Sequence, residues 1–170
     1  MRRRVPRLLR VNRGFRDYWT GQTISLFGDQ IALLAIPLLA VLTLNADAEQ
    51  MGLLGAVELA PNLLFAFAFG AWADRRASRR AILIAADLGR ALILFGIPLA
   101  SLLGVLTMPF LYLAAFATGT FGTLFMVSEQ TVFTSLVKPA EYVEANSLLI
   151  GSRSVAIVSG KTLGGLLVAA

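Results

Sequence analysis

The feature that most constrains this chain is a short charged loop between two long apolar segments. Residues 70–83 read Gly-Ala-Trp-Ala-Asp-Arg-Arg-Ala-Ser-Arg-Arg-Ala-Ile-Leu, with four arginines and one aspartate. Charge at this density cannot lie in hydrocarbon, so the loop must sit at a membrane surface, and Lys and Arg gather in cytoplasmic loops. The charged loop therefore predicts a membrane protein and also its orientation.

The composition is that of a polytopic membrane protein. Of the 170 residues, 57% are hydrophobic and only 15% are charged, against roughly a quarter in an average soluble domain. The formal charge of +5 comes from arginine-rich blocks at the N-terminus and in the charged loop, which suit the anionic headgroups of a lipid bilayer. Nucleic acid is not expected as a partner, because the basic blocks adjoin apolar segments instead of a soluble module.

The sequence contains neither cysteine nor histidine. Disulfides, thiolate nucleophiles, the usual general base and the commonest metal ligands are thereby removed. We therefore expect no enzymatic activity, no metal site and no cofactor.

Apolar segments alternate with polar connections and predict an all-α, polytopic transmembrane helical bundle of about five spans. Residues 1–21 form a basic cytoplasmic tail with an interfacial aromatic segment, and residues 22–170 form an incomplete transmembrane domain. At about 1.5 Å of rise per residue, such segments cross a core about 30 Å thick. The connection 45–50 is acidic without Lys or Arg, which places it outside and the N-terminus in the cytoplasm. The expected spans are 22–44, 51–72, 81–103, 109–136 and 147–170.

Ionisable residues inside the spans are candidates for a functional site. Asp29 lies in the first span and Glu58 in the second. Each carboxylate either holds a polar cluster between helices or takes part in proton coupling or substrate binding, since buried carboxylates can exchange protons near neutral pH. Asp87 and Arg90 are spaced i, i+3 in the third span, which allows an ion pair on one helix face.

The fifth segment carries a small residue at every fourth position, a pattern that lets another helix approach closely. Gly160, Gly164 and the adjacent Gly165 are the expected packing residues. Lys161 lies among them, where a charge near mid-membrane costs about 2.5–3.5 kcal/mol on insertion scales. It is interpreted as a partner for one of the carboxylates, as a substrate-contacting cation, or as a lesion in a truncated gene.

The charged loop resembles the signature loop of the major facilitator superfamily, which lies between the second and third helices of these transporters. The matching residues are Gly70, Asp74, Arg75, Arg79 and Arg80, while Ser78 or Ala77 stands where the family has a central glycine. The resemblance implies a gate in which Asp74 pairs with charges on neighbouring helices when the cytoplasmic side is closed. Its candidate partners near the same membrane face are Asp87, Arg90 and Glu129.

Other stretches resemble the drug and siderophore exporters related to the enterobactin exporter. They are residues 15–19, 25–29, 58–61, 87–91 and 144–148, in family order over nearly the whole chain. Two features depart from that branch. Lys161 replaces the proline of the fifth-helix motif, and the fourth helix lacks the arginine of many proton-coupled members.

The resemblance implies a secondary transporter in the bacterial inner membrane that moves small amphipathic or drug-like molecules outward by alternating access, driven by a proton gradient if coupled. The chain would supply less than one of the two halves, so its partners would be the missing C-terminal helices. The alternative is a non-transporting regulatory or assembly subunit that packs against another membrane protein through Gly160 and Gly164. Further spans encoded after Ala170 would favour the transporter, and a co-purifying multispan partner would favour the subunit.

Overall fold

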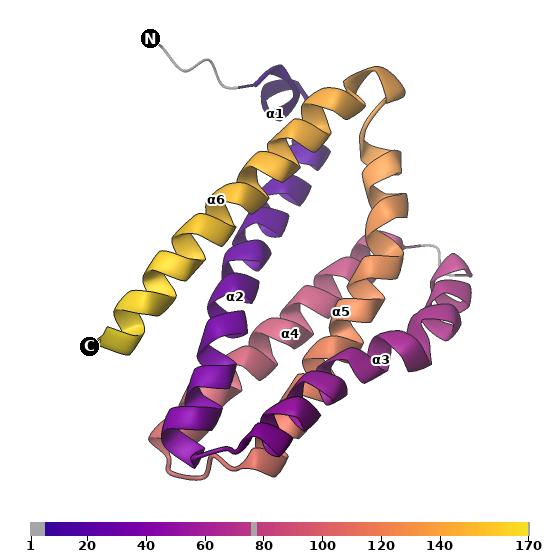
Figure 1. Cartoon of the computed structure of the whole chain (residues 1–170). Coiled ribbons are helices and arrows are strands. Elements are labelled where there is room, and N and C mark those ends of the chain that lie inside the picture. Colours follow the sequence, from indigo (N-terminus) through magenta and orange to yellow (C-terminus); the bar gives the residue numbers. More distant parts are fainter. Residues whose placement is uncertain (1–5, 76–77, 170) are drawn as a thin grey trace. The chain divides into compact units, whose positions relative to one another are not determined.

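The computed structural model describes residues 6–75 and 78–169, and of residues 161–169 it describes only the course of the helix. Every regular element in this part of the chain is helical (Figure 1), which confirms the all-α prediction. The long helices are α2 (Arg13–Leu44), α3 (Ala48–Asp74), α4 (Arg79–Leu102), α5 (Met108–Leu136) and α6 (Tyr142–Ala169). Two short helices accompany them, α1 (Arg7–Val11) and the 3-10 helix η1 (Pro139–Glu141).

Four helices within the described part are long and apolar enough to cross a membrane, namely α2, α3, α4 and α5. They contain or nearly coincide with the first four expected spans, whereas the fifth expected span corresponds to α6. The main difference lies at the N-terminus, where α2 begins at Arg13 and not near Gln22. The apolar run begins at the later position, but the helix itself begins where a cap is available.

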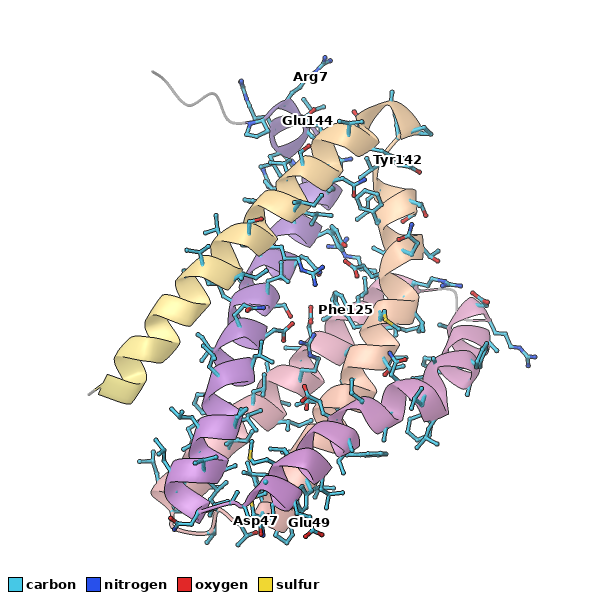
Figure 2. The ribbon with its side chains drawn as sticks, viewed as in Figure 1. Arg7, Asp47, Glu49, Phe125, Tyr142 and Glu144 are labelled. Atoms are coloured by element: carbon cyan, nitrogen blue, oxygen red, sulfur yellow. The ribbon has the colours of Figure 1, made fainter. Side chains whose placement is uncertain are left out.

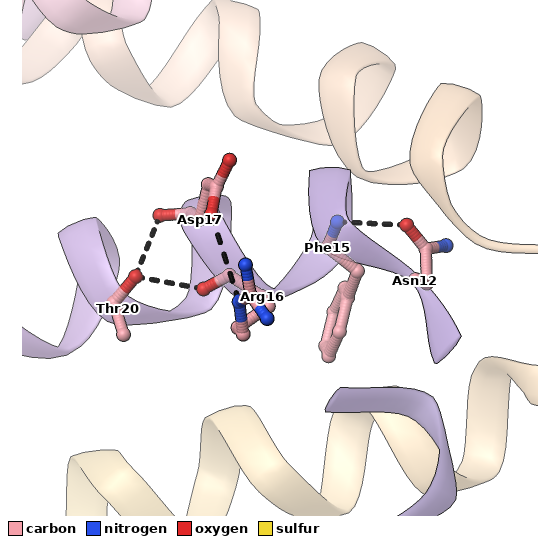
Figure 3. A network of polar contacts seen from close by, with 5 residues as sticks. All are labelled: Asn12, Phe15, Arg16, Asp17 and Thr20. Carbon is pink, nitrogen blue, oxygen red and sulfur yellow. Dashed lines mark hydrogen bonds and ion pairs between the residues drawn. The ribbon is translucent and has the colours of Figure 1, made fainter. Parts of the chain in front are cut away.

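That cap is Asn12. Its side-chain Oδ1 accepts a hydrogen bond from the backbone N–H of Phe15 at 2.9 Å (Figure 3), as an N-cap residue does for one of the unpaired N–H groups of the first turn. The starts of α3 and α4 follow the same rule. Asp47 and Gln50 form a capping box at the start of α3, and Ser78 accepts from Ala81 N at the start of α4.

The chain divides into two compact units, each with its own apolar core. Unit 2, residues 35–132, contains the end of α2, the whole of α3 and α4, and most of α5. Figure 1 shows α3, α4 and the first part of α5 side by side. Buried residues from all of these helices form one cluster: Ala40, Leu54, Ile97, Ala100, Leu106, Met108, Leu111, Ala114 and Ala115.

Two glycines lie at close contacts between helices of unit 2. A Cβ built on Gly119 of α5 would collide with the backbone carbonyl oxygen of Glu58 on α3. A Cβ on Gly89 of α4 would lie 2.7 Å from the ring of Phe121 on α5. Small residues let helix backbones approach in this way, which is a common packing device of membrane helices.

Unit 1, residues 1–34 and 133–170, contains α1, the first part of α2, the end of α5, η1 and α6. Its core brings the N-terminal segment against the α5–α6 connection. Phe15 is fully buried, and the rings of Phe133 and Tyr142 lie 5.6 Å apart. The buried members of the cluster are Leu8, Leu9, Phe15, Phe133, Val137 and Ala145.

Large apolar side chains also lie exposed along α3. Phe67 is 93% exposed and Leu63 is 82% exposed. In water such a surface would be costly, at about 25 cal/mol per Å² of apolar area. On a helix of membrane-spanning length and composition, the same surface suits contact with lipid tails or with other apolar helices.

Candidate functional site

The charged loop is organised around the guanidinium of Arg79. Arg79 forms an ion pair with Asp74 and also donates a hydrogen bond to Thr131 Oγ1 at 3.0 Å. Asp74 is the last residue of α3, Arg79 is the first residue of α4, and Thr131 lies on α5. One side chain thus connects the ends of two helices to the side of a third. We call Asp74, Arg79 and Thr131 the loop cluster.

Helix dipoles give this pairing a physical reason. The C-terminus of a helix carries partial negative charge and its N-terminus partial positive charge. Asp74 lies at the negative end of α3 and Arg79 at the positive end of α4, so each charge is unfavourably placed on its own helix. Their mutual ion pair offsets both penalties, and the side chain of Arg79 is only 17% exposed while that of Asp74 is 71% exposed.

The remaining signature residues lie in or next to the charged loop. Arg75 is exposed and caps α3 through its backbone N–H. Arg80 is exposed in the first turn of α4. Gly70 lies in α3, and a Cβ added there would meet nothing within 4 Å. Among the described residues, therefore, no close approach is seen at Gly70.

Asp87 and Arg90 form an ion pair on α4, with Arg90 Nη1 3.7 Å from Asp87 Oδ1. Asp87 lies eight residues beyond Arg79, which corresponds to about 12 Å along an α-helix. Asp74 forms an ion pair with Arg79 of its own loop, while Asp87, Arg90 and Glu129 stay predicted partners. Glu129 is half-buried on α5, two residues before Thr131, and a separation of two puts these side chains on different helix faces.

The two carboxylates expected at depth differ in their surroundings. Asp29 is half-buried on α2 in unit 1. Glu58 is exposed on α3 in unit 2, ten residues after the helix begins at Ala48. That is about 15 Å along the helix axis. A carboxylate at such a depth faces protein or a water-filled path in a membrane, because lipid contact is costly.

Gly160 is buried on α6, where an added Cβ would lie 2.5 Å from Gln30 Cβ on α2. The helices therefore approach closely at Gly160. The side chain of Lys161 and the surroundings of Gly164 and Gly165 lie outside the described residues.

Sequence reasoning missed three contributors: Thr131, Asn12 and Gly119. Only Asn12 had a usable signal, since asparagine is one of the residue types that commonly precede the first residue of a helix. Within the described part of the chain, no three acidic side chains gather as a metal site would need.

Long apolar helices joined by short connections, with an arginine-centred ion pair in one connection, define a multi-pass α-helical membrane protein. Comparison with protein families then identifies it further. Residues 18–170 match the Major Facilitator Superfamily. The chain belongs to this family of membrane transporters, which are not enzymes.

Among curated proteins, the chain is similar to the uncharacterized MFS-type transporter YfiS of Bacillus subtilis. The two are 29% identical over 163 residues, which cover 96% of this chain and 38% of the relative. The chain thus spans less than half the length of that relative. No solved structure matches it.

Proposed function

We propose that this chain is part of a secondary transporter that exports small amphipathic or drug-like molecules across the bacterial inner membrane by alternating access. Family membership supports transport of a small molecule through a lipid bilayer. The proposal that transport runs outward rests on the resemblance of five sequence stretches to the drug and siderophore exporters. The transport path of the complete protein would run between two helical halves.

The observation that carries the proposal is the bridge made by Arg79. Alternating access needs contacts that hold in one state and break in the other. Arg79 holds the ends of α3 and α4 to α5 through Asp74 and Thr131. Both charges are unfavourably placed on their own helices. The ion pair therefore forms when the helix ends come together, and its stabilisation is lost when they separate. In this proposal the loop cluster is the gate.

Asp29 and Glu58 are proposed as the proton-coupling or substrate-contacting carboxylates. Support comes from the half-burial of Asp29 and from the depth of the exposed Glu58 along α3. Ionisable groups in membrane spans are energetically costly. They generally face the protein interior or a water-filled cavity, and they mark substrate or ion pathways. Lys161 is the third candidate for proton coupling or substrate contact, because a charged side chain in a spanning segment costs free energy and is rare without a function.

The test is efflux of an amphipathic fluorescent dye from cells that express the reading frame containing this chain. Asp74→Asn and Arg79→Gln should each slow efflux by about fivefold or more, the low end of coupling between conformational states. Glu49→Gln is the matched control, because Glu49 is an exposed carboxylate in the first turn of α3, at the opposite end from Asp74. Equal efflux by all three variants at equal expression would refute the gate.

The same assay applied to the 170-residue chain tests whether it transports alone. We expect no efflux, because the family path lies between two halves. Efflux by the purified, reconstituted 170-residue chain would contradict this expectation.

A further inference from the structure

The short helix α1 has two chemically different faces. Leu8 and Leu9 are buried in the core of unit 1, whereas Arg7 and Arg10 are exposed. Val11 is also 73% exposed. Because residues three and four apart share a helix face, Arg7, Arg10 and Val11 point outward together.

This outward face is held in place by hydrogen bonds to the rest of unit 1. The backbone N–H of Leu8 donates to Glu144 Oε1 at 3.0 Å, so the first turn of α1 is fixed to the start of α6. Figure 2 shows Arg7 and Glu144 at this end of the two helices. Asn12 Nδ2 donates to the carbonyl oxygen of Leu136 at 2.7 Å, where α5 ends. The arginines of α1 therefore project from a packed element and not from a loose tail.

Two further exposed arginines follow at the start of α2. Arg13 and Arg16 are spaced i, i+3, like Arg7 and Arg10. Arg16 Nε lies 3.8 Å from Asp17 Oδ1, so part of its charge is compensated (Figure 3). Among the described residues, Arg7, Arg10 and Arg13 take part in no ion pair. We call the exposed Arg7, Arg10 and Val11 of α1, together with the exposed Arg13 at the start of α2, the α1 face.

We propose that the α1 face binds the phosphate headgroups of anionic phospholipids, and that bound lipid clamps α1 onto the α5–α6 connection. Guanidinium groups match phosphate oxygens in geometry and charge. The exposed valine favours lipid over a soluble anion, because interfacial helices place an apolar side chain among acyl chains while their arginines reach the headgroups.

The clamp follows from mass action. A ligand that binds the folded state alone stabilises that state. The α1 face exists only while Leu8 and Leu9 are packed and while Leu8 N and Asn12 keep their hydrogen bonds. Anionic lipid therefore stabilises the contacts that join α1 to Glu144 and Leu136. This effect does not depend on transport.

The experiment follows thermal unfolding of the full chain in neutral detergent micelles, with phosphatidylglycerol, phosphatidylcholine or free glycerol phosphate added. Three versions are compared: the parent chain, Arg7→Gln/Arg10→Gln/Arg13→Gln, and Arg7→Lys/Arg10→Lys/Arg13→Lys. Gln, Lys and Arg have similar helix propensities, so the three versions differ mainly in charge. Val11→Ser tests the apolar contribution separately.

We expect phosphatidylglycerol alone to raise the unfolding temperature of the parent and of the Lys version. Each arginine near an anionic surface strengthens binding by about fivefold, so the Gln version should bind on the order of a hundredfold more weakly. Val11→Ser should also weaken the response to phosphatidylglycerol.

Three results would overturn the proposal. They are equal phosphatidylglycerol binding by the parent and the Gln version, an equal response to free glycerol phosphate, and a full response in Val11→Ser. If the triple Gln version does not fold, Arg10→Gln alone decides, because its affinity should fall by about fivefold and an unchanged affinity contradicts the clamp.

Discussion

Gly119 of α5 gives a sharp test of how unit 2 is packed. A methyl group at residue 119 would overlap the backbone carbonyl oxygen of Glu58 and would lie 3.2 Å from Pro61 Cγ, both on α3. A carbonyl oxygen belongs to the helix backbone and cannot turn away like a flexible side chain. Removing the overlap therefore requires α3 or α5 to shift as a whole. We expect Gly119→Ala to destabilise the protein through this contact.

The magnitude follows from two opposing effects. Overpacking a well-packed site costs about 1–3 kcal/mol, while Ala favours a helix over Gly by about 1 kcal/mol. The net loss is about 0–2 kcal/mol. Gly122→Ala is the matched control, because Gly122 lies on the same helix and its added Cβ meets no described atom within 4 Å. Both variants gain the same helix propensity. The difference between their free energies of unfolding therefore isolates the cost of overpacking.

The assay is unfolding of the purified chain in mixed micelles with increasing SDS, followed by circular dichroism. Gly119→Ala should unfold at lower SDS than Gly122→Ala, by an amount equivalent to about 1–3 kcal/mol. Gly89→Ala should show a smaller loss against Gly96→Ala, since its contact is the movable ring of Phe121. A Gly119→Ala protein as stable as Gly122→Ala would refute the close α3–α5 crossing.

Three further predictions address the topology, the N-terminal cap and the proposed proton coupling. The chain has no native cysteine, so Ser78→Cys should react with a membrane-impermeant maleimide only from the cytoplasmic side and Thr107→Cys only from the opposite side; the reverse pattern would overturn the topology. Asn12→Ala should lower the free energy of unfolding by about 1 kcal/mol in the SDS titration through loss of the cap, whereas Ala at the exposed Asn146 should have little effect, and equal losses would contradict the cap. Asp29→Asn should abolish the proton dependence of dye efflux by the complete reading frame, and unchanged proton-driven efflux would exclude Asp29 from coupling.

The sequence predicted the features that depend on local composition. Apolar runs predicted the all-helical class that the structure contains. The i, i+3 spacing indicated the Asp87–Arg90 ion pair that the structure contains. These features need only the chemistry of one segment. The contact of Arg79 with Thr131 depends on how α5 is rotated about its own axis. The two residues are 52 positions apart in the sequence, and the sequence between them does not reveal that rotation.

The N-terminus shows the same limit more clearly. Residues 1–21 read as a tail because their charge is high, yet Leu8, Leu9 and Phe15 are buried in the core of unit 1. A single turn of helix is too short for periodicity to be recognised, since two apolar residues fit almost any pattern. The energy that fixes α1 comes from contacts with residues more than 120 positions away, and such contacts leave no signal in the segment itself.

One signal was nevertheless present in the sequence at the loop cluster. A helix that ends in aspartate and a next helix that begins with two arginines both contradict the charge preference of helix termini. In most proteins the local preferences of the residues, including their charges, favour the structure that the chain adopts. Residues that contradict these preferences concentrate at functional sites. The structure resolves the conflict by joining Asp74 to Arg79. Because the pair relieves a penalty that each helix end otherwise carries alone, separating the helix ends raises the free energy of both. That coupling between helix position and charge is what a gate at this loop requires.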